Sequence, residues 1–281
     1  MKINFSIWKK KIIAAFIAGL FLLSSPHVFA DGTNDPAVEL QTLVAQINAK
    51  IAKGDRAETD FAPEIKQFDD LLAEHKGEKT DAVAQILYMK AVLYGEVLGD
   101  DTKADALIQQ LKTDFKGTQL VGLIEQQEAK EAAAKKIRDS LVVGTKFPVF
   151  SEQDSEGKPL SISDHKGKVL LVDFWATWCG PCRIEMPNVI AAYQKYHGKG
   201  FDIIGISLDE DKQALADYTQ EEGMSWPQFF DGQKWDNKLA VKYGVESVPT
   251  TYLLDGNGNI IAEDLRGDDL DVALAKALAS K

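Results

Sequence analysis

Two cysteines carry the clearest chemical signal in this sequence. Cys179 and Cys182 are the only cysteines among the 281 residues, and they stand in the run WCGPC at 178–182. An apolar run at 169–175 precedes them, and a helix is predicted over 181–196. A thiol at a helix N-terminus faces unpaired N–H groups and the positive end of the dipole, which lower its pKa. We therefore expect a redox pair, with Cys179 as the exposed nucleophile and Cys182 resolving the mixed disulfide.

Three other uses of the cysteine pair are weaker. A structural disulfide across two residues closes a tiny loop and constrains the unfolded chain little. A structural zinc site needs about four ligands, and no closely spaced histidine pair accompanies these cysteines. A copper site would want a well-placed histidine or methionine, and Met186 is the only near candidate. The redox interpretation is therefore favoured.

The second half of the chain alternates strand and helix patterns around this pair. The run at 169–175 is apolar almost throughout, as in a strand buried on both faces. Further strands are predicted at 201–208, 250–254 and 259–262, and further helices at 213–222, 237–243 and 268–281. Strands that alternate with helices and end in a hairpin indicate an α/β domain with a mixed sheet.

The first half of the chain is predicted to be helical. Residues 31–140 carry apolar side chains mostly at three- and four-residue steps, which predicts five helices. The hairpin expected from 82–98 and 103–115 resembles one tetratricopeptide repeat, whereas a solenoid needs about three. A small helical bundle is the expectation, and a docking surface for a partner is the alternative. His75 is expected to be solvated near a helix end.

The first thirty residues have the three parts of an export signal. Lys2 and the lysines at 9–11 form a basic start, residues 12–23 form an unbroken apolar run, and a small-x-small site ends at Ala30. The run is short for a membrane span, so a cleaved signal peptide at 1–30 is expected rather than an uncleaved anchor. The mature protein is then soluble and exported, to the periplasm or an equivalent compartment where disulfides persist.

The length of the chain indicates how many domains to expect, and its charge excludes some kinds of partner. A chain of 281 residues favours two domains, here 31–140 and 141–281. Acidic residues outnumber basic ones 43 to 32, for a net charge of −11. Such a chain is not expected to bind nucleic acid or an anionic membrane surface as its main partner. Two cysteines are also too few for a disulfide-dense scaffold.

The sequence resembles the thioredoxin-fold proteins of the TlpA/ResA type. The run FWATWCGPCR at 174–183 carries the likeness, and GVESVPT at 244–250 is similar to the family's cis-proline loop. Residues 212–235 fall where this branch carries extra helical and extended structure. The resemblance covers 143–281. It implies an α/β thioredoxin-like domain, a mixed sheet flanked by helices, preceded here by an all-α domain.

The resemblance also assigns roles to matching positions. It implies that Cys179 and Cys182 form a redox-active disulfide, with no other cofactor and no metal. Pro249 matches the cis-proline that lies against the cysteines. Val248 would offer backbone hydrogen bonds to an extended substrate chain, and Trp178 would shape the docking surface.

Two carboxyl groups are candidates for proton transfer. Asp173 lies within the buried strand run and matches thioredoxin's buried aspartate, which helps Cys182 gain or lose its proton. A buried acid without a counter-charge has a raised pKa, as a proton shuttle needs. Glu185 follows Cys182 by three residues and matches a glutamate that tunes the cysteines of ResA-type proteins. Glu185 could equally be an ordinary acid on the helix surface. Whether Asp173 or Glu185 is the main proton relay is left open.

The leading hypothesis is an exported thiol–disulfide oxidoreductase that reduces the disulfides of exported proteins. The resemblance points to a membrane electron donor of the DsbD or CcdA type and to apocytochrome c among the targets. A thiol peroxidase is one alternative, but Val172 and Ala176 stand where its Pro-x3-Thr-x2-Cys motif would place proline and threonine. A non-enzymatic adaptor that uses residues 31–140 is the other.

Overall fold

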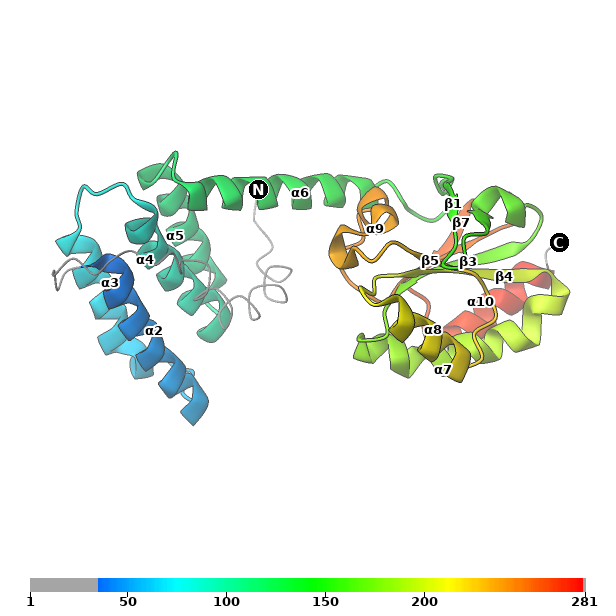
Figure 1. Ribbon diagram of the computed structural model, residues 1–281, viewed down its shortest axis with the longest axis horizontal. Coiled ribbons are helices and arrows are strands. Elements are labelled where there is room, and N and C mark those ends of the chain that lie inside the picture. The colour runs from blue at the N-terminus through cyan, green and yellow to red at the C-terminus, as the bar shows by residue number, and fades with distance from the viewer. Residues whose placement is uncertain (1–34, 280–281) are drawn as a thin grey trace. The chain divides into compact units, whose positions relative to one another are not determined.

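The computed structural model describes residues 35–279 (Figure 1), so the signal peptide predicted at 1–30 lies outside the described residues. Within 35–279, no helix is long and apolar enough to cross a membrane. Contacts divide the chain into two compact units, with the division between Glu128 and Ala129. The domain boundary expected between residues 140 and 141 stays a prediction.

Helices form the described part of the first unit, as predicted. They are α2 (Pro36–Lys53), α3 (Ala62–Glu74), α4 (Asp81–Val92), α5 (Asp101–Asp114) and α6 (Gln119–Arg138), with a 3-10 turn at Glu58–Phe61 and a π turn at Leu93–Val97. Polar side chains cap the starts of α2 and α4: Asp35 accepts a hydrogen bond from the Ala37 N–H at 2.9 Å, and Thr80 from the Val83 N–H at 3.3 Å. The last turns of α6 belong to the second unit.

His75 does not lie in solvent as expected. Its side chain is buried at the end of α3, with Nδ1 3.1 Å from Glu78 Oε1 and Nε2 3.5 Å from Glu39 Oε2. The hydrogen bond with Glu78 is the main cause that raises the pKa of His75 above its ordinary value. The expectation was wrong because Glu39, on α2, brings a partner to the ring that the local sequence does not reveal.

A five-stranded mixed sheet forms the centre of the second unit, with the strand order β5-β4-β3-β6-β7. The strands are β3 (Val169–Trp175), β4 (Phe201–Ser207), β5 (Gln228–Phe230), β6 (Thr250–Leu254) and β7 (Ile260–Glu263). Central β3 runs parallel to β4 and antiparallel to β6. A separate hairpin joins β1 (Ser151–Gln153) to β2 (Pro159–Ser161). This arrangement confirms the predicted thioredoxin-like mixed sheet.

Within the described part of the second unit, four α-helices accompany the sheet. They are α7 (Gly180–Tyr196), α8 (Lys212–Glu221), α9 (Lys238–Lys242) and α10 (Asp268–Ala279). Helices α7 and α10 pack against each other, and side chains from both line one cavity with those of β3. Figure 1 shows them side by side along the sheet.

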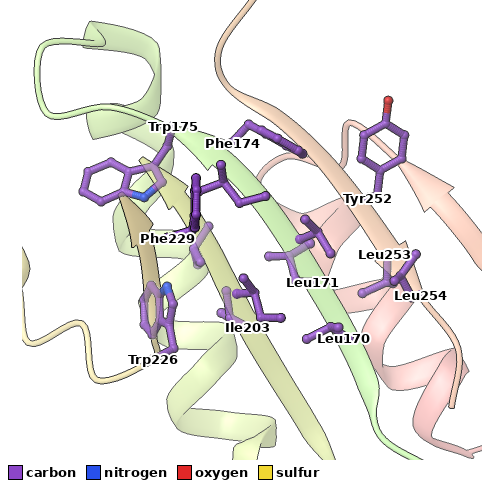
Figure 2. Close-up of a cluster of buried hydrophobic side chains, with 14 of the residues drawn as sticks. Leu170, Leu171, Phe174, Trp175, Ile203, Trp226, Phe229, Tyr252, Leu253 and Leu254 are labelled. Carbon is purple, nitrogen blue, oxygen red and sulfur yellow. The ribbon is translucent and has the colours of Figure 1, made fainter. Parts of the chain in front are cut away.

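Strand β3 is buried along its whole length and supplies both faces of the core (Figure 2). Asp173 and Trp175 point to the α7 face, where they line a cavity with Cys182. Phe174 points to the other face, with its ring centroid 6.0 Å from that of Tyr243. The strand's last residues are thereby fixed from both sides, just before the cysteines.

The side chain that binds the Trp175 indole occupies the space beside a glycine in the neighbouring strand. Trp175 Nε1 donates to Gln228 Oε1 at 3.0 Å, and both side chains are buried. The Gln228 amide occupies the space beside Gly205, where an added Cβ would lie 1.9 Å from Gln228 Oε1. Gly205 is therefore required by this close approach.

Replacing Gly205 with alanine should destabilise the second unit. The new methyl group must displace the Gln228 amide, and overpacking of this kind costs about 1–3 kcal/mol. The denaturation midpoint of the Gly205→Ala variant measures the loss. Gly122→Ala is the matched control, because nothing lies within 4 Å of that Cβ and a helical Gly-to-Ala change stabilises by up to about 1 kcal/mol. A Gly205→Ala chain as stable as the wild type would contradict the packing argument.

Candidate functional site

The two cysteines meet at the N-terminus of α7. Cys179 is the N-cap residue of the helix, and its Sγ accepts a hydrogen bond from the Cys182 N–H at 3.1 Å. The sulfurs form a disulfide of 2.04 Å. Cys179 is 5% exposed and Cys182 2%. The expectation of an exposed Cys179 does not hold for this disulfide form, in which the carbonyl oxygen of Val248 lies 3.5 Å from Cys179 Sγ.

The turn before Cys179 is held by a buried acid that the sequence analysis did not single out. Asp209 accepts hydrogen bonds from the Thr177 N–H at 3.1 Å and the Thr177 hydroxyl at 2.7 Å. The Ser207 hydroxyl also donates to Asp209, at 2.8 Å. Asp209 therefore fixes the chain between β3 and α7 from the end of β4. The sequence does contain one signal for this role, because Asp209 is an acid that directly follows the predicted buried strand at 201–208.

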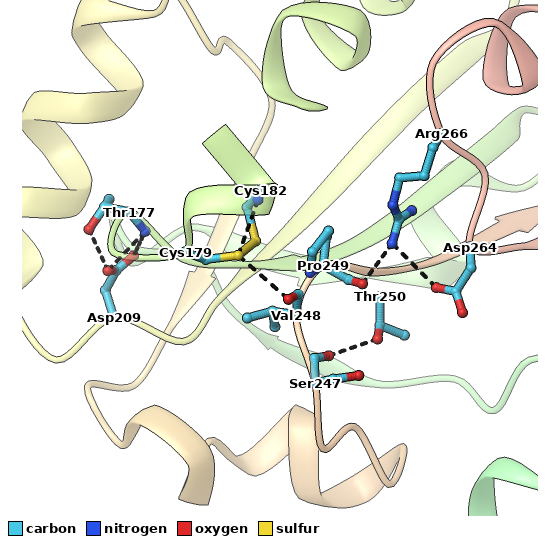
Figure 3. The surroundings of a disulfide bond; sticks show 10 residues. All are labelled: Thr177, Cys179, Cys182, Asp209, Ser247, Val248, Pro249, Thr250, Asp264 and Arg266. Atoms are coloured by element: carbon cyan, nitrogen blue, oxygen red, sulfur yellow. Dashed lines mark hydrogen bonds and ion pairs between the residues drawn. A yellow bond between two sulfur atoms is a disulfide. The ribbon is translucent and has the colours of Figure 1, made fainter. Parts of the chain in front are cut away.

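The loop that carries Pro249 lies against the disulfide (Figure 3). The Val248–Pro249 peptide bond is cis, in agreement with the resemblance. The Val248 carbonyl oxygen is 3.5 Å from Cys179 Sγ. On the far side of the loop, Arg266 Nη2 donates to the Pro249 carbonyl at 2.6 Å, and Nη1 donates to Thr251 Oγ1 at 3.1 Å. The sequence analysis missed Arg266, whose local sequence carries no signal of these contacts.

Asp173 lies beneath the disulfide and is 3% exposed. Burial raises its pKa from 3.8 to about 7, although the positive charge of Arg266 opposes the rise and the negative charge of Glu185 adds to it. Asp173 lines a cavity of about 10 Å³ together with Cys182. A space of that size is at the lower limit for one water molecule. The carboxyl group is thus near the sulfur and titrates near neutral pH.

Glu185 lines the same cavity but its carboxylate is committed elsewhere. Oε1 accepts from the Gly267 N–H at 2.8 Å, and Oε2 accepts from Asn188 Nδ2 at 3.2 Å. The side chain therefore ties α7 to the segment that precedes α10. The structure places both predicted carboxyl groups beside Cys182, and the choice of main relay stays a prediction.

Trp178 forms part of the surface next to the disulfide. It is 47% exposed, and its ring meets that of Trp235 edge to face at 5.8 Å. Trp175, in contrast, is fully buried. Arg183 turns away toward α8, with its guanidinium 5.7 Å from the Tyr218 ring centroid. Trp178 and Trp235 thus form an aromatic pair, and the docking role expected of Trp178 stays a prediction.

The arrangement has the parts that dithiol–disulfide exchange requires. A sulfur at a helix N-terminus can carry negative charge, and a second sulfur three residues on can displace a bound partner. A buried carboxyl group beside the second sulfur can take up its proton. Among residues 35–279, no cluster of three or more His, Cys, Asp or Glu side chains is placed to hold a metal ion.

Comparison with known proteins shows that the second unit is similar to thiol-disulfide oxidoreductases. The Redoxin family matches residues 142–278. The thiol-disulfide oxidoreductase ResA of Bacillus anthracis is 35% identical over 127 residues, which cover 45% of this chain and 71% of that protein. ResA of Bacillus subtilis (strain 168) is 31% identical over 124 residues, covering 44% and 68%.

Solved structures match over the same extent. The thioredoxin domain of a thiol-disulfide oxidoreductase from Bacteroides vulgatus is 34% identical with a TM-score of 0.45, covering 49% of this chain and 98% of that one. A thiol:disulfide interchange protein from Bacteroides sp. is 33% identical with a TM-score of 0.45, covering 50% and 92%.

The raised pKa of Asp173 predicts a specific pH dependence of stability. Between pH 3.8 and about 7, the unfolded chain releases this proton while the folded chain keeps it, so folding loses up to about 4 kcal/mol as the pH rises. The Asp173→Asn variant should lack this decline and be more stable than the wild type at pH 8. Denaturant unfolding of the oxidised protein across pH 3–9 measures it.

Asp202 provides a control of opposite sign. Burial opposes ionisation there, but hydrogen bonds from His165 and Lys168 outweigh it and lower the pKa of Asp202 to about 2. Its contribution is present above pH 3.8 and is lost as the pH falls through about 2. Asp202→Asn should therefore lose stability at neutral pH. If the stability of the wild type and of Asp173→Asn changed with pH in the same way, the raised pKa assigned to Asp173 would be wrong.

Proposed function

The chain belongs to the Redoxin family as a ResA-like thiol–disulfide oxidoreductase, and on that basis we propose that it acts after export as a reductant of disulfides in other exported proteins. The observation that carries the exchange chemistry is the Cys179–Cys182 disulfide, which lies at the N-terminus of α7 and is faced by the Val248–Pro249 loop.

The direction of the proposed reaction is supported by the groups around Cys179. A couple becomes a strong oxidant when its reduced form is stabilised. The Cys182 N–H at the helix N-terminus donates to Cys179 Sγ and favours a thiolate, but the carbonyl oxygen of Val248 also faces this sulfur, and an acceptor does not stabilise a thiolate. Arg183, the nearby cation in sequence, lies over Tyr218 instead. The run at 178–182 also resembles the active site of thioredoxin, a reductant.

The reaction proceeds in two exchange steps. The Cys179 thiolate attacks one sulfur of the target disulfide, forms a mixed disulfide and releases the first target thiolate. Cys182 then gives its proton to the Asp173 carboxylate and attacks Cys179 Sγ. This step closes the Cys179–Cys182 disulfide and releases the second target thiolate. Two electrons have passed from the dithiol to the target.

Each turnover leaves the protein oxidised, so the proposed reductant needs an electron source. An exported protein has no access to cytoplasmic reductants, and a membrane carrier of the DsbD or CcdA type fits this need. Exported thiol proteins, apocytochrome c among them, are the proposed targets. Export itself is supported by the basic start, the apolar run at 12–23 and the site at Ala30.

The reduction potential of Cys179–Cys182 tests the direction. For the chain from residue 31 onward, we expect a value near that of thioredoxin, roughly −270 mV. Equilibration in dithiol–disulfide buffers, followed by alkylation of free thiols, measures it. A chain with both cysteines changed to serine is the control and should show no transition. A value near that of DsbA, roughly −120 mV, would reverse the proposed direction.

Trapping of mixed disulfides tests the targets and the compartment together. In cells that express the full chain, Cys182→Ser should accumulate covalent complexes through Cys179, because no second sulfur can resolve them. Cys179→Ser is the matched control and should trap almost nothing. Complexes formed with exported proteins are the expected result. Complexes formed only with cytoplasmic proteins, or only by Cys179→Ser, would contradict the proposal.

A further inference from the structure

The last turn of α6 contacts the segment that leads to the cis-proline. Arg138 Nη1 donates to the Gly244 carbonyl at 2.6 Å and lies 2.6 Å from Glu246 Oε2. Both contacts lie within the second unit. Glu246 is two residues before Val248, whose carbonyl faces Cys179 Sγ. One side chain of α6 is therefore linked through two groups to the loop that covers the disulfide.

A backbone contact one turn earlier strengthens this link. Gly244 has a φ of +66°, and a Cβ added there would lie 2.4 Å from the Ala134 carbonyl oxygen. Only glycine allows the loop to come this close to the helix. Ala134 and Arg138 are four residues apart and so share one face of α6. The helix meets the loop through a continuous strip rather than through one ion pair.

Arg138 also compensates a charge that would otherwise be costly. The Glu246 side chain is 13% exposed, and its Oε2 atom is buried without a hydrogen bond. A buried carboxylate needs an opposite charge close by. Arg138 supplies that charge, and in doing so fixes Glu246 in position.

The loop is thus held on two sides. Arg138 binds it at Gly244 and Glu246, before the cis bond, and Arg266 binds the Pro249 carbonyl directly after it. Arg266 lies inside the family match at 142–278, whereas Arg138 lies outside it.

We propose that Arg138 is a positioning residue for substrate docking. Through Gly244 and Glu246 it holds Val248 where its backbone can pair with an extended segment of the target. The docking part of this inference rests on the proposed function. The positioning of the loop by α6 stands on the contacts alone.

Arg138→Ala in the full chain tests both parts. A hydrogen bond to a charged group is strong enough that its loss should raise hydrogen exchange about tenfold, and we expect this in peptides that cover 244–250. With insulin as a protein disulfide, KM should rise by a similar factor, while kcat stays within about twofold. The reaction with a small aromatic disulfide and the reduction potential should not change, because neither needs the docked backbone.

Three further variants separate positioning from general stability. Lys135→Ala removes a cation from the same helix whose partner, Asp139, is exposed, and it should change none of these readouts. Arg138→Lys keeps the charge and one donor and should recover most of the loss. Arg138→Ala combined with Glu246→Gln removes the unpaired carboxylate, and the loop should still exchange faster.

The outcomes that overturn the inference are distinct. Exchange over 244–250 that matches Lys135→Ala would show that Arg138 does not position the loop. Faster exchange that extends equally to peptides from β4 would show a general loss of stability instead. If the wild type does not reduce insulin at all, the proposed direction fails, while the exchange measurement still decides whether Arg138 holds the loop.

Discussion

The junction between β3 and α7 is the constraint on which the site depends. A cysteine pair at a helix N-terminus can exchange disulfides only if the turn before it is fixed, since one sulfur must meet an incoming chain and the second must then reach the first. Burial of β3 on both faces fixes one end of the turn. Asp209 fixes the middle through Thr177, and Cys179 caps the helix itself. The rest of the second unit keeps these three supports in place.

Arg266 affects both the position of the cis-proline loop and the pKa of Asp173. Its guanidinium holds the Pro249 carbonyl, and its charge also limits the rise in the pKa of Asp173. Glu185 also has two effects. It accepts a hydrogen bond from the Gly267 N–H, and its charge raises the pKa of Asp173. A movement of the segment 264–267 would therefore change loop position and proton affinity together.

The fold class and the redox pair could be predicted from local patterns and the family resemblance, whereas the cis-proline position followed from the resemblance alone, because sequence does not show a peptide-bond isomer. The strand run at 169–175 and the helix after Pro181 are readable from apolar spacing and capping. Extended structure was expected somewhere within 212–235, but the position of strand β5 was not predicted, since three residues are too few to show a period. The burial of His75 was missed for another reason, because its partner Glu39 is 36 residues away in the sequence.

The contacts of Arg138 and Arg266 suggest how one site can keep its chemistry and change its targets. The two sulfurs, the helix N-terminus that Cys179 caps and the predicted relay Asp173 all lie within residues 142–278, where the Redoxin family matches. The docking loop is held from inside that region by Arg266 and from outside it by Arg138. A change in α6 can therefore alter how a target is held without touching the atoms that exchange electrons. On the proposal made for Arg138, the last turn of α6 belongs to the docking site.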